Sequence, residues 1–365
     1  MSDTYRRYRA IKRALTQCFG TLQGHQARRL HTLVALICGI VGSRHTHLPQ
    51  IASHAPGSGA VQESVIMRFR RWLQNDHISV EQWMLPVAQA LLQALAHQPL
   101  FLVMDGSTVG RGCLALMVSL LYGNRALPLA WVVVKQRKGH LPQEVHRALL
   151  AQIHVLLPAG ATVIFLGDGE FDGTDLQTDM RQFGWHYVCR TASNILVTAF
   201  GYQFAIGDVP LAPGEGWYLP NAQMTETQYG PVTLLGVWES KYTSPLYLVT
   251  NLADPDQALT YYRRRAHIET FFSDQKSRGF HVHASHISAP QRLARLLIAS
   301  CLAYIWIIYL GVHALQDTWR RRLHRRHRCD LSLFQLGLRL VAYCLRENLP
   351  IPEGLLVPAS PSIIT

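Results

Sequence analysis

The sequence predicts an α/β protein in which a helical N-terminal part precedes a mixed sheet. Three observations predict this fold class. Apolar residues recur at spacings of three and four from Tyr5 to about His97, buried-strand runs begin after Pro99, and short alternating segments fill residues 193–250. With 365 residues, of which 48% are hydrophobic, the chain can bury a large core.

Within the helical part, the segment from Val61 to Asn75 has two distinct faces. Its apolar residues form one stripe, whereas Ser64, Arg68 and Arg71 share another face. This polar face can lie on DNA, with Leu48 to His54 as the first helix of a helix-turn-helix. An ordinary amphipathic helix with a solvated basic face fits the same pattern, and the residues alone leave both interpretations open.

After Pro99, five apolar runs have the composition of buried strands, and two helical segments separate them. Three strands come first, then a helix, a strand, a second helix and a fifth strand, which is the element order of a ribonuclease H-like fold. In that fold the first strand lies beside the fourth. The expected strands are Leu100–Met104, Leu114–Leu121, Leu129–Val134, Val163–Leu166 and Trp185–Val188, and the expected helices are Gln143–Leu157 and Thr174–Gln182.

The remainder of the chain combines a β-rich region with further helices. Residues 193–250 are rich in Gly, Pro, Thr, Tyr and Trp, which predicts a β-rich insertion. Helices are expected at Asp256–Gly279, where Gly279 is placed to stop the helix, at Pro290–Gln316 and at Leu331–Glu347.

The charge balance favours a polyanionic partner. Lys and Arg total 35 against 23 Asp and Glu, a formal charge of +12, so nucleic acid is the first candidate and an anionic membrane surface the second. The basic tract Trp319–Arg328 suits either a phosphate-binding strip or a solvated linker. Seven cysteines without a C-x-x-C pair indicate a reducing compartment, and Met1 to Gly20 lacks an export signal, so we expect a cytoplasmic protein.

One apolar run requires a choice between two kinds of helix. Residues 296–316 contain no Asp, Glu, Lys or Arg, and about 20 apolar residues can span a bilayer. A transmembrane helix is therefore one interpretation. We favour the core helix of a large soluble domain, because the run includes Ser300, His313 and Gln316 and stands alone.

Two aspartates follow apolar runs in the expected sheet. Asp105 ends the strand Leu100–Met104, and Asp168 follows the strand Val163–Leu166 and Gly167. Because the first and fourth strands are neighbours, both carboxylates should reach one metal ion. Carboxylate oxygens are the ligands of the two Mg²⁺ ions that phosphodiester cleavage uses. An Asp at a strand end also starts turns and caps helices, so neither aspartate alone identifies such a site.

A third carboxylate belongs to a polar helix stripe. The helix around it contains the pattern Y-x2-R-x3-E-x6-K, formed by Tyr262, Arg265, Glu269 and Lys276. At about 100° per residue these four side chains fall within roughly 60° of one helix face. The stripe offers a metal-binding carboxylate beside two cations and a phenol, which suits a scissile phosphate. A surface helix with Arg and Glu paired four residues apart explains the same pattern.

This helix matches the YREK signature, and the chain therefore resembles the bacterial insertion-sequence transposases of the IS-four group, cut-and-paste members of the DDE superfamily. The resemblance extends in outline over residues 45–316, and the family is known to carry a β-rich insertion before its Glu. Asp105 is similar to the first catalytic Asp, and the segment Gly167–Gly173 is similar to the second Asp segment. Members often place a basic residue and Gly after that Asp, whereas this chain has Gly169 and Glu170.

The resemblance implies roles for particular residues. Asp105, Asp168 and Glu269 would be catalytic and hold two Mg²⁺ ions, for which Mn²⁺ can substitute, while Tyr262, Arg265 and Lys276 would contact DNA phosphates. The implied reaction is hydrolysis at the transposon end, hairpin formation, hairpin opening and strand transfer into target DNA. A hairpin requires an unstacked base, commonly supported by an aromatic of the insertion. Trp238 is the first candidate and Trp217 the second, although a place in the core explains either tryptophan better.

The sequence predicts five parts. The expected partner is double-stranded DNA, the expected oligomer is a homodimer in the synaptic complex, and no membrane association is expected. A nuclease of the same fold that does not join strands, and a non-catalytic DNA-binding protein derived from a transposase, are the alternatives. A zinc site at His281, His283 and His286 is a further alternative, although no cysteine pattern supports it. The parts are a helical DNA-binding domain (1–98), the first part of the ribonuclease H-like core (99–192), the β-rich insertion (193–250), the second part of the core (251–316) and a basic, helical C-terminal part (317–365).

Overall fold

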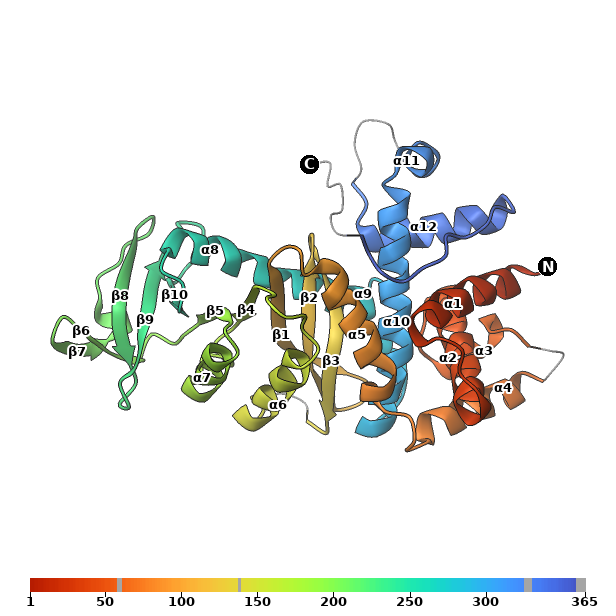
Figure 1. Ribbon diagram of the computed structural model, residues 1–365, viewed down its shortest axis with the longest axis horizontal. Helices are drawn as coiled ribbons and strands as arrows, with labels where there is room; N and C mark the ends of the chain where they lie inside the picture. The colour runs from red at the N-terminus through yellow and green to blue at the C-terminus, as the bar shows by residue number, and fades with distance from the viewer. Residues whose placement is uncertain (58–60, 137–138, 325–329, 359–365) are drawn as a thin grey trace.

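The computed structural model describes residues 1–57, 61–136, 139–324 and 330–358. Figure 1 shows an elongated molecule, with the N-terminal helices at one end and the hairpin of β6 and β7 at the other. A continuous apolar core joins the N-terminal helices to the sheet and to the long helix α10. Of the basic tract at 319–328, residues 325–328 lie outside the described residues.

The N-terminal part is entirely helical, as its apolar spacing predicts. Side chains cap two of its helices: Ser2 accepts from the backbone N–H of Tyr5, and Ser79 accepts from that of Gln82. The last helix packs on strand β3, so the helical part is anchored directly to the sheet. The helices are α1 (Asp3–Phe19), α2 (Gly24–Ser43), α3 (Leu48–His54), α4 (Gln62–Gln74) and α5 (Val80–Leu95).

The strands form one mixed sheet in the order β3-β2-β1-β4-β5-β10-β9-β8-β6-β7. Strands β1, β2 and β3 are antiparallel, while β4 runs parallel to both β1 and β5, so the first and fourth strands are neighbours as predicted. The mixed sheet with its helices is consistent with the predicted ribonuclease H-like core. The strands are β1 (Leu100–Val109), β2 (Cys113–Tyr122), β3 (Arg125–Val134), β4 (Val163–Gly167), β5 (His186–Arg190), β6 (Leu196–Ala199), β7 (Tyr202–Ala205), β8 (Gly216–Met224), β9 (Tyr229–Val237) and β10 (Leu246–Thr250).

The expectation that Asp105 ends its strand is wrong. β1 continues to Val109 because β2 pairs with it along this whole stretch, with Asp105 opposite Met117 and Val109 opposite Cys113. The parallel ladder with β4 stops earlier, at Val103. Asp105 therefore lies within β1 but just past the end of its pairing with β4, which still directs it toward the loop that carries Asp168.

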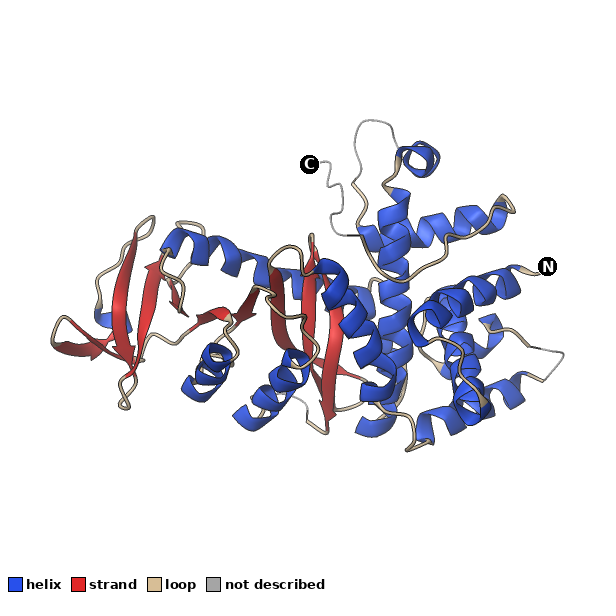
Figure 2. Cartoon of the chain, in the orientation of Figure 1, coloured by secondary structure: helices blue, strands red, loops and turns tan. Residues whose placement is uncertain are grey.

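The β-rich region at 193–250 extends the core sheet. Antiparallel pairing of β10 with β5 joins it edge to edge to the core, through pairs such as Val249 and Cys189. Figure 2 shows that helices surround the β1–β5 half, whereas the β6–β9 end consists mainly of strands and loops. Two aromatic side chains at the tip of the β6–β7 hairpin, Phe200 and Tyr202, are largely exposed.

The helix expected from Asp256 to Gly279 is not continuous. It consists of α8 (Pro255–Arg263), a single 3₁₀ turn at Arg264–Ala266 and α9 (His267–Gln275). Gly279 does not stop it; the chain leaves the helix after Gln275 and folds back on α9. A Cβ on Gly279 would lie 2.0 Å from the carbonyl oxygen of Asp274, so glycine is required here by close approach.

The apolar run at 296–316 belongs to α10 (Pro290–Ala314), and it is a core helix in this fold. It is long and apolar enough to cross a membrane, but 94% of its most apolar stretch is buried by the rest of the protein. It packs against α12, α2 and β3, which joins the two ends of the chain to the sheet. The other helices are α6 (Gln143–His154), α7 (Thr174–Gln182), α11 (Asp317–Leu323) and α12 (Leu333–Arg346).

Candidate active site

Three carboxylates meet at one guanidinium group. Arg265 Nη1 lies 3.4 Å from Asp105 Oδ2 and 3.9 Å from Asp168 Oδ2, and its Nη2 lies 3.6 Å from Glu269 Oε1. Asp105 comes from β1, Asp168 from the loop after β4, and Glu269 from the first turn of α9. The sequence predicted the convergence of the carboxylates, whereas the central place of Arg265 is a result of the fold.

The cluster is partly enclosed and carries excess negative charge. The side chains of Arg265 and Asp105 are 18% and 20% exposed, whereas that of Glu269 is 65% exposed. Burial, followed by repulsion from Asp168, raises the pKa of Asp105 to about 6, although Arg265 and the backbone N–H of Gly106 act in the opposite direction. A second cation at this point would therefore be electrostatically favourable.

The loop after β4 is held by its own hydrogen bonds. Asp168 Oδ1 accepts from the backbone N–H of Glu170 at 3.0 Å. Glu170 in turn accepts from the N–H of Leu141 at 2.9 Å and lies 3.3 Å from the buried ring of His146. Burial would raise the pKa of Glu170, but contact with His146 and the Leu141 N–H lowers it. Glu170, which departs from the family pattern, thus anchors the loop that carries Asp168.

Lys276 and Tyr262 lie near the carboxylates without joining their cluster. Lys276 Nζ donates to Ser107 Oγ at 2.6 Å, and Ser107 follows Asp105 by two residues on the same face of β1. Burial lowers the pKa of Lys276, an effect that Asp105 partly offsets. Burial also raises the pKa of Tyr262, against the influence of Arg265. The 3₁₀ turn and the early end of α9 break the predicted straight stripe, so these side chains reach the site from different elements.

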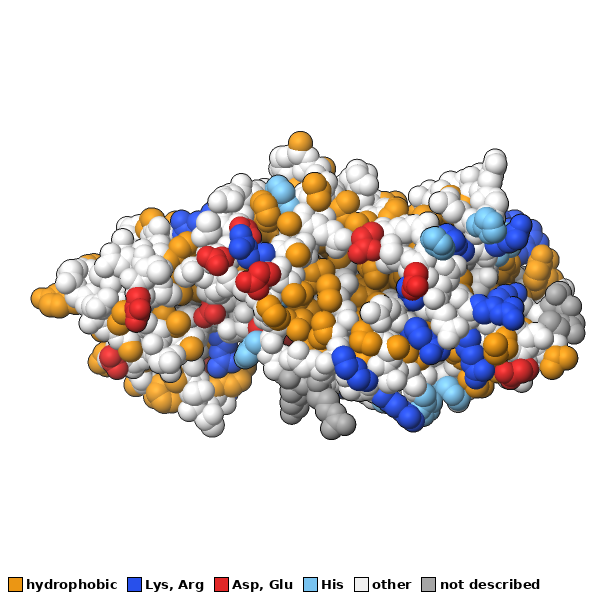
Figure 3. Space-filling view, turned by 90° about the horizontal axis from the view of Figure 1, so that it is seen from below, with side chains coloured by type: hydrophobic (Ala, Val, Ile, Leu, Met, Phe, Trp, Pro, Cys, Tyr) orange, Lys and Arg blue, Asp and Glu red, His pale blue; other side chains and the backbone are white. Residues whose placement is uncertain are grey.

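The remaining predicted DNA contacts lie elsewhere. Arg68 and Arg71 are exposed on α4, at the end of the molecule opposite the insertion (Figure 1). Figure 3 shows most Lys and Arg side chains of that face over the helical end. Trp238 is partly exposed, and its indole N–H donates to the carbonyl of Tyr242 at 3.0 Å. Trp217 packs against Gly236 and near the ring of Tyr247, which makes it part of the insertion's packing.

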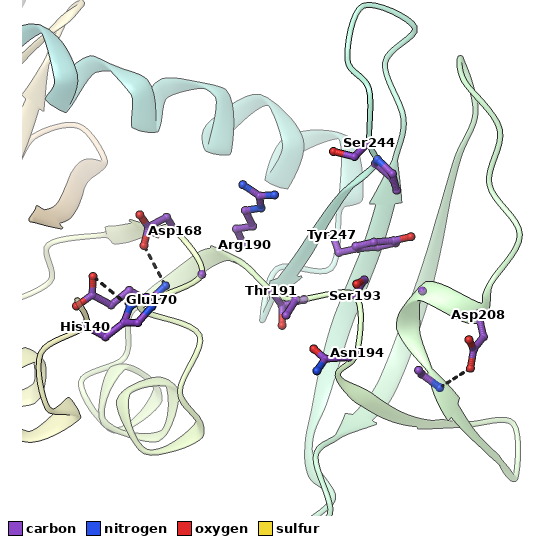
Figure 4. A pocket seen from close by; sticks show the side chains of 15 residues that line it. His140, Asp168, Glu170, Arg190, Thr191, Ser193, Asn194, Asp208, Ser244 and Tyr247 are labelled. Atoms are coloured by element: carbon purple, nitrogen blue, oxygen red, sulfur yellow. Dashed lines mark hydrogen bonds and ion pairs between the residues drawn. The ribbon is translucent and has the colours of Figure 1, made fainter. Parts of the chain in front are cut away.

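A cavity of about 820 Å³ opens beside Asp168, between the core and the insertion. Figure 4 shows Asp168 and Glu170 at one side, the ring of Tyr247 at the other, and Arg190 between them. Arg190 and Tyr247 were not singled out from the sequence. The position of Arg190 at the end of β5, beside the strand that leads to Asp168, was the available signal.

The three carboxylates have the chemistry of a divalent-cation site. They are hard oxygen donors that already share one cation, and such donors suit Mg²⁺ or Mn²⁺. In the described part of the chain, however, no group of three or more His, Cys, Asp or Glu side chains is spaced to hold a metal as it stands. The same finding applies to the histidines at 281–286. Asp105, Asp168 and Glu269 are thus the residues that would hold such ions. The Arg265 side chain would have to move away from them first.

One of three comparisons with known proteins identifies the family of the chain. No curated protein sequence matches the chain. Among solved structures, the chain is similar to a piggyBac transposase in a synaptic complex with hairpin DNA, at 10% identity and a TM-score of 0.48, covering 94% of this chain and 78% of that one. That likeness is too distant to support a conclusion. The family model of the transposase DDE domain matches residues 97–306, more than half of the chain, and includes all three carboxylates; the protein therefore belongs to the DDE transposase family.

Proposed function

We propose that the protein is a cut-and-paste DNA transposase of the IS-four group. It binds transposon ends, cleaves them by hydrolysis, passes through a hairpin and transfers the 3′-OH ends into target DNA. The observation that carries this proposal is the convergence of Asp105, Asp168 and Glu269 on Arg265 in a chain of the DDE transposase family. Membership in the IS-four group rests on the pattern of Tyr262, Arg265, Glu269 and Lys276.

Asp105, Asp168 and Glu269 hold the metal in this proposal. Two Mg²⁺ ions, replaceable by Mn²⁺, would supply an activated water and neutralise the leaving oxygen when bound. The protein's part is to position three carboxylates from separate elements. Burial and repulsion from Asp168 raise the pKa of Asp105, and a cation bound beside it would favour the ionised form.

Arg265 changes partners in this proposal. Without DNA its guanidinium holds the carboxylates at 3.4–3.9 Å, distances longer than a good charge-assisted hydrogen bond. A DNA phosphate offers the same group a bidentate acceptor. Arg265 therefore moves to the phosphate beside the scissile bond, with Tyr262 and Lys276 on neighbouring phosphates.

DNA contacts outside the carboxylate cluster complete the proposal. Arg68 and Arg71 bind the transposon end, and Trp238 supports the base that leaves the stack at the hairpin. The cavity beside Asp168 gives the end of such a hairpin a place next to the chemistry. Two copies acting on two ends require a homodimer in the synaptic complex, and the cytoplasm, with its nucleoid, is the proposed location.

An assay of cleavage and joining tests the function. Labelled DNA carrying the inverted repeats that flank the gene is incubated with the protein and Mg²⁺, and hairpins and strand-transfer products are measured. Hairpins and joined products are the expected result. Cleavage without joining would identify a ribonuclease H-like nuclease, and specific binding without cleavage would identify a non-catalytic DNA-binding protein.

A further inference from the structure

Five histidines from two distant segments form one cluster. His45 and His47 lie between α2 and α3, while His281, His283 and His286 follow α9. The rings of His45 and His281 stack with centroids 5.2 Å apart, and those of His47 and His286 meet edge to face at 5.0 Å. The His281 and His283 rings are 5.7 Å apart. We call these five residues the histidine cluster.

Hydrogen bonds identify the acceptor nitrogen in two rings of the cluster, those of His45 and His286. The backbone N–H of His47 donates to His45 Nδ1 at 2.9 Å, and Arg111 Nη2 lies 2.8 Å from His286 Nδ1. An arginine can only donate, so Nδ1 of His286 must accept, as must Nδ1 of His45. In these hydrogen bonds Nδ1 of each ring carries no hydrogen, so the N–H donor of each ring is at Nε2.

The surroundings of the histidine cluster are positively charged. Arg44 and Arg111 are exposed beside it, and Lys276 acts on His283. Burial and then the neighbouring histidines lower the pKa of His45, and burial and then His286 lower that of His47. Within residues 1–57, 61–136, 139–324 and 330–358, no carboxylate forms an ion pair with the cluster. The exposed positive charge nearest to the cluster is therefore that of Arg44 and Arg111.

The histidine cluster adjoins the candidate active site. The backbone N–H of His281 donates to the carbonyl of Lys276 at 3.0 Å, and the Lys276 side chain reaches Ser107 on β1. On the other side, Thr46 Oγ1 donates to the carbonyl of His281 at 3.1 Å. The cluster thus bridges the active-site segment and the start of α3.

We propose that the histidine cluster, with Arg111, is a phosphate-binding surface for duplex DNA that leads from the candidate active site toward the N-terminal helices. This proposal rests on the transposase function proposed above. Phosphate oxygens accept from ring N–H groups of the cluster, and most strongly from protonated rings. An approaching phosphate also favours ring protonation, which adds charge and frees Arg111 from His286 to bind the phosphate. DNA binding at this surface therefore takes up protons.

The test uses the double variant His281→Asn and His286→Asn in the full chain. Both positions have positive φ, 52° and 61°, which Asn tolerates better than most residues, and Asn Oδ1 can still accept from Arg111. The exposed histidines His25 and His97 provide the control variant, with the same two changes to Asn.

The binding of a fluorescent DNA duplex of arbitrary sequence is measured at constant salt across the histidine range. Near pH 6 the double variant should bind roughly threefold to tenfold more weakly than the natural chain, and near pH 8 the difference should be clearly smaller. The control variant should follow the natural chain throughout. Parallel pH profiles of the natural chain and the double variant would overturn the proposal.

A second measurement needs no variant. Diethyl pyrocarbonate modifies accessible neutral histidines, and mass spectrometry of the natural chain should show that the duplex protects the peptide with His281 to His286 but not His97. Equal modification with and without DNA would overturn the proposal even if the double variant fails to fold. If the natural chain cleaves labelled ends but shows no such protection, only this surface is wrong. If it neither binds nor cleaves DNA, the transposase function itself fails.

Discussion

Helix α9 takes part in two carboxylate–guanidinium arrangements that differ in charge balance and in exposure. Glu269, near its start, joins the three-carboxylate cluster at Arg265. Asp274, near its end, forms a one-to-one pair with Arg125 of β3 at 3.1 Å. Five residues along a helix turn the side chain by roughly 140°, so one helix faces the open site with one carboxylate and the core with the other.

The two arrangements differ in burial and in charge balance, which distinguishes the candidate active site from a structural ion pair. In the Arg125–Asp274 pair both side chains are almost fully buried, at 10% and 5% exposure, and one charge meets one charge. At Arg265 one cation serves three carboxylates that are 20%, 33% and 65% exposed, so the cluster keeps negative charge for an incoming cation. The excess negative charge and solvent access at Arg265 indicate a functional site. The balanced, buried charges of Arg125 and Asp274 indicate a structural role.

The largest expected effect is the loss of chemistry at the cluster. Asp105→Asn, Asp168→Asn and Glu269→Gln should each reduce cleavage at least about 10³-fold and leave end binding nearly intact, because each removes a metal-binding charge without changing shape. Labelled transposon ends with Mg²⁺ provide both measurements. The exposed carboxylate Asp256, changed to Asn, is the control. Near wild-type cleavage by any of the three variants would remove that residue from the catalytic set.

Changes to the Arg125–Asp274 pair should alter the free energy of unfolding. Asp274→Ala leaves the Arg125 charge buried without its partner and should cost about 3–5 kcal/mol of unfolding free energy at neutral pH. The double change Arg125→Met and Asp274→Leu should recover most of that loss, since it removes both charges. Urea denaturation measures both. If Asp274→Ala is as stable as the natural chain, the Arg125–Asp274 pair does not have the structural role that its burial indicates.

Arg265 should affect DNA handling more than metal use. Arg265→Ala should lower end affinity and hairpin formation roughly tenfold to a hundredfold, and Arg265→Lys should not restore full activity, because lysine lacks the planar fork. Lys276→Ala should also lose affinity. A Mg²⁺ titration at saturating DNA discriminates the roles. If the metal requirement shifts strongly while DNA affinity is unchanged, Arg265 belongs to the metal site.

The pair also predicts a pH dependence of stability. Burial raises the pKa of Asp274 to about 6, despite the opposing effect of Arg125. A carboxyl whose pKa is higher in the folded state binds its proton more tightly there, so its contribution is present at low pH and is lost as pH rises toward about 6. Thermal unfolding from pH 4 to 7 should show this decline, on the order of 2 kcal/mol for Asp274, and Asp274→Asn should reduce the total decline by that amount while the part due to Asp105, whose pKa is also raised to about 6, stays. A decline of equal size in the variant would assign it to other groups.

The smallest expected effect concerns exposed arginines with no place in either arrangement. Replacing Arg68 and Arg71 by Ala should weaken end binding several-fold and flatten its salt dependence by up to about two units of slope. Arg70→Ala is the matched control on the same helix, since Arg70 already lies 3.7 Å from Glu63. Unchanged affinity and slope in the double variant would reduce α4 to a supporting helix.

Local patterns in the sequence predicted most elements and singled out the three carboxylates as candidates, while the resemblance to a family assigned their roles. The helices Leu48–His54 and Thr174–Gln182 have the expected bounds, because apolar periodicity and flanking turn residues act within a few positions. Asp168 was found for the same reason: it follows a short buried strand directly. The domain boundaries and the DNA-contact roles stay predictions.

Contacts between distant segments decided the rest. Pairing with β2 extends β1 through Asp105, although the Asp-Gly pair alone suggests a turn. The 3₁₀ turn at Arg264–Ala266 places Arg265 among carboxylates up to 160 residues away in sequence, which no helical wheel describes. The Arg125–Asp274 pair and the histidine cluster are likewise invisible to periodicity. Apolar periodicity shows which face of a segment packs on the core. The pairing of charges depends on which other segment lies against that face. Only the tertiary structure determines that neighbour.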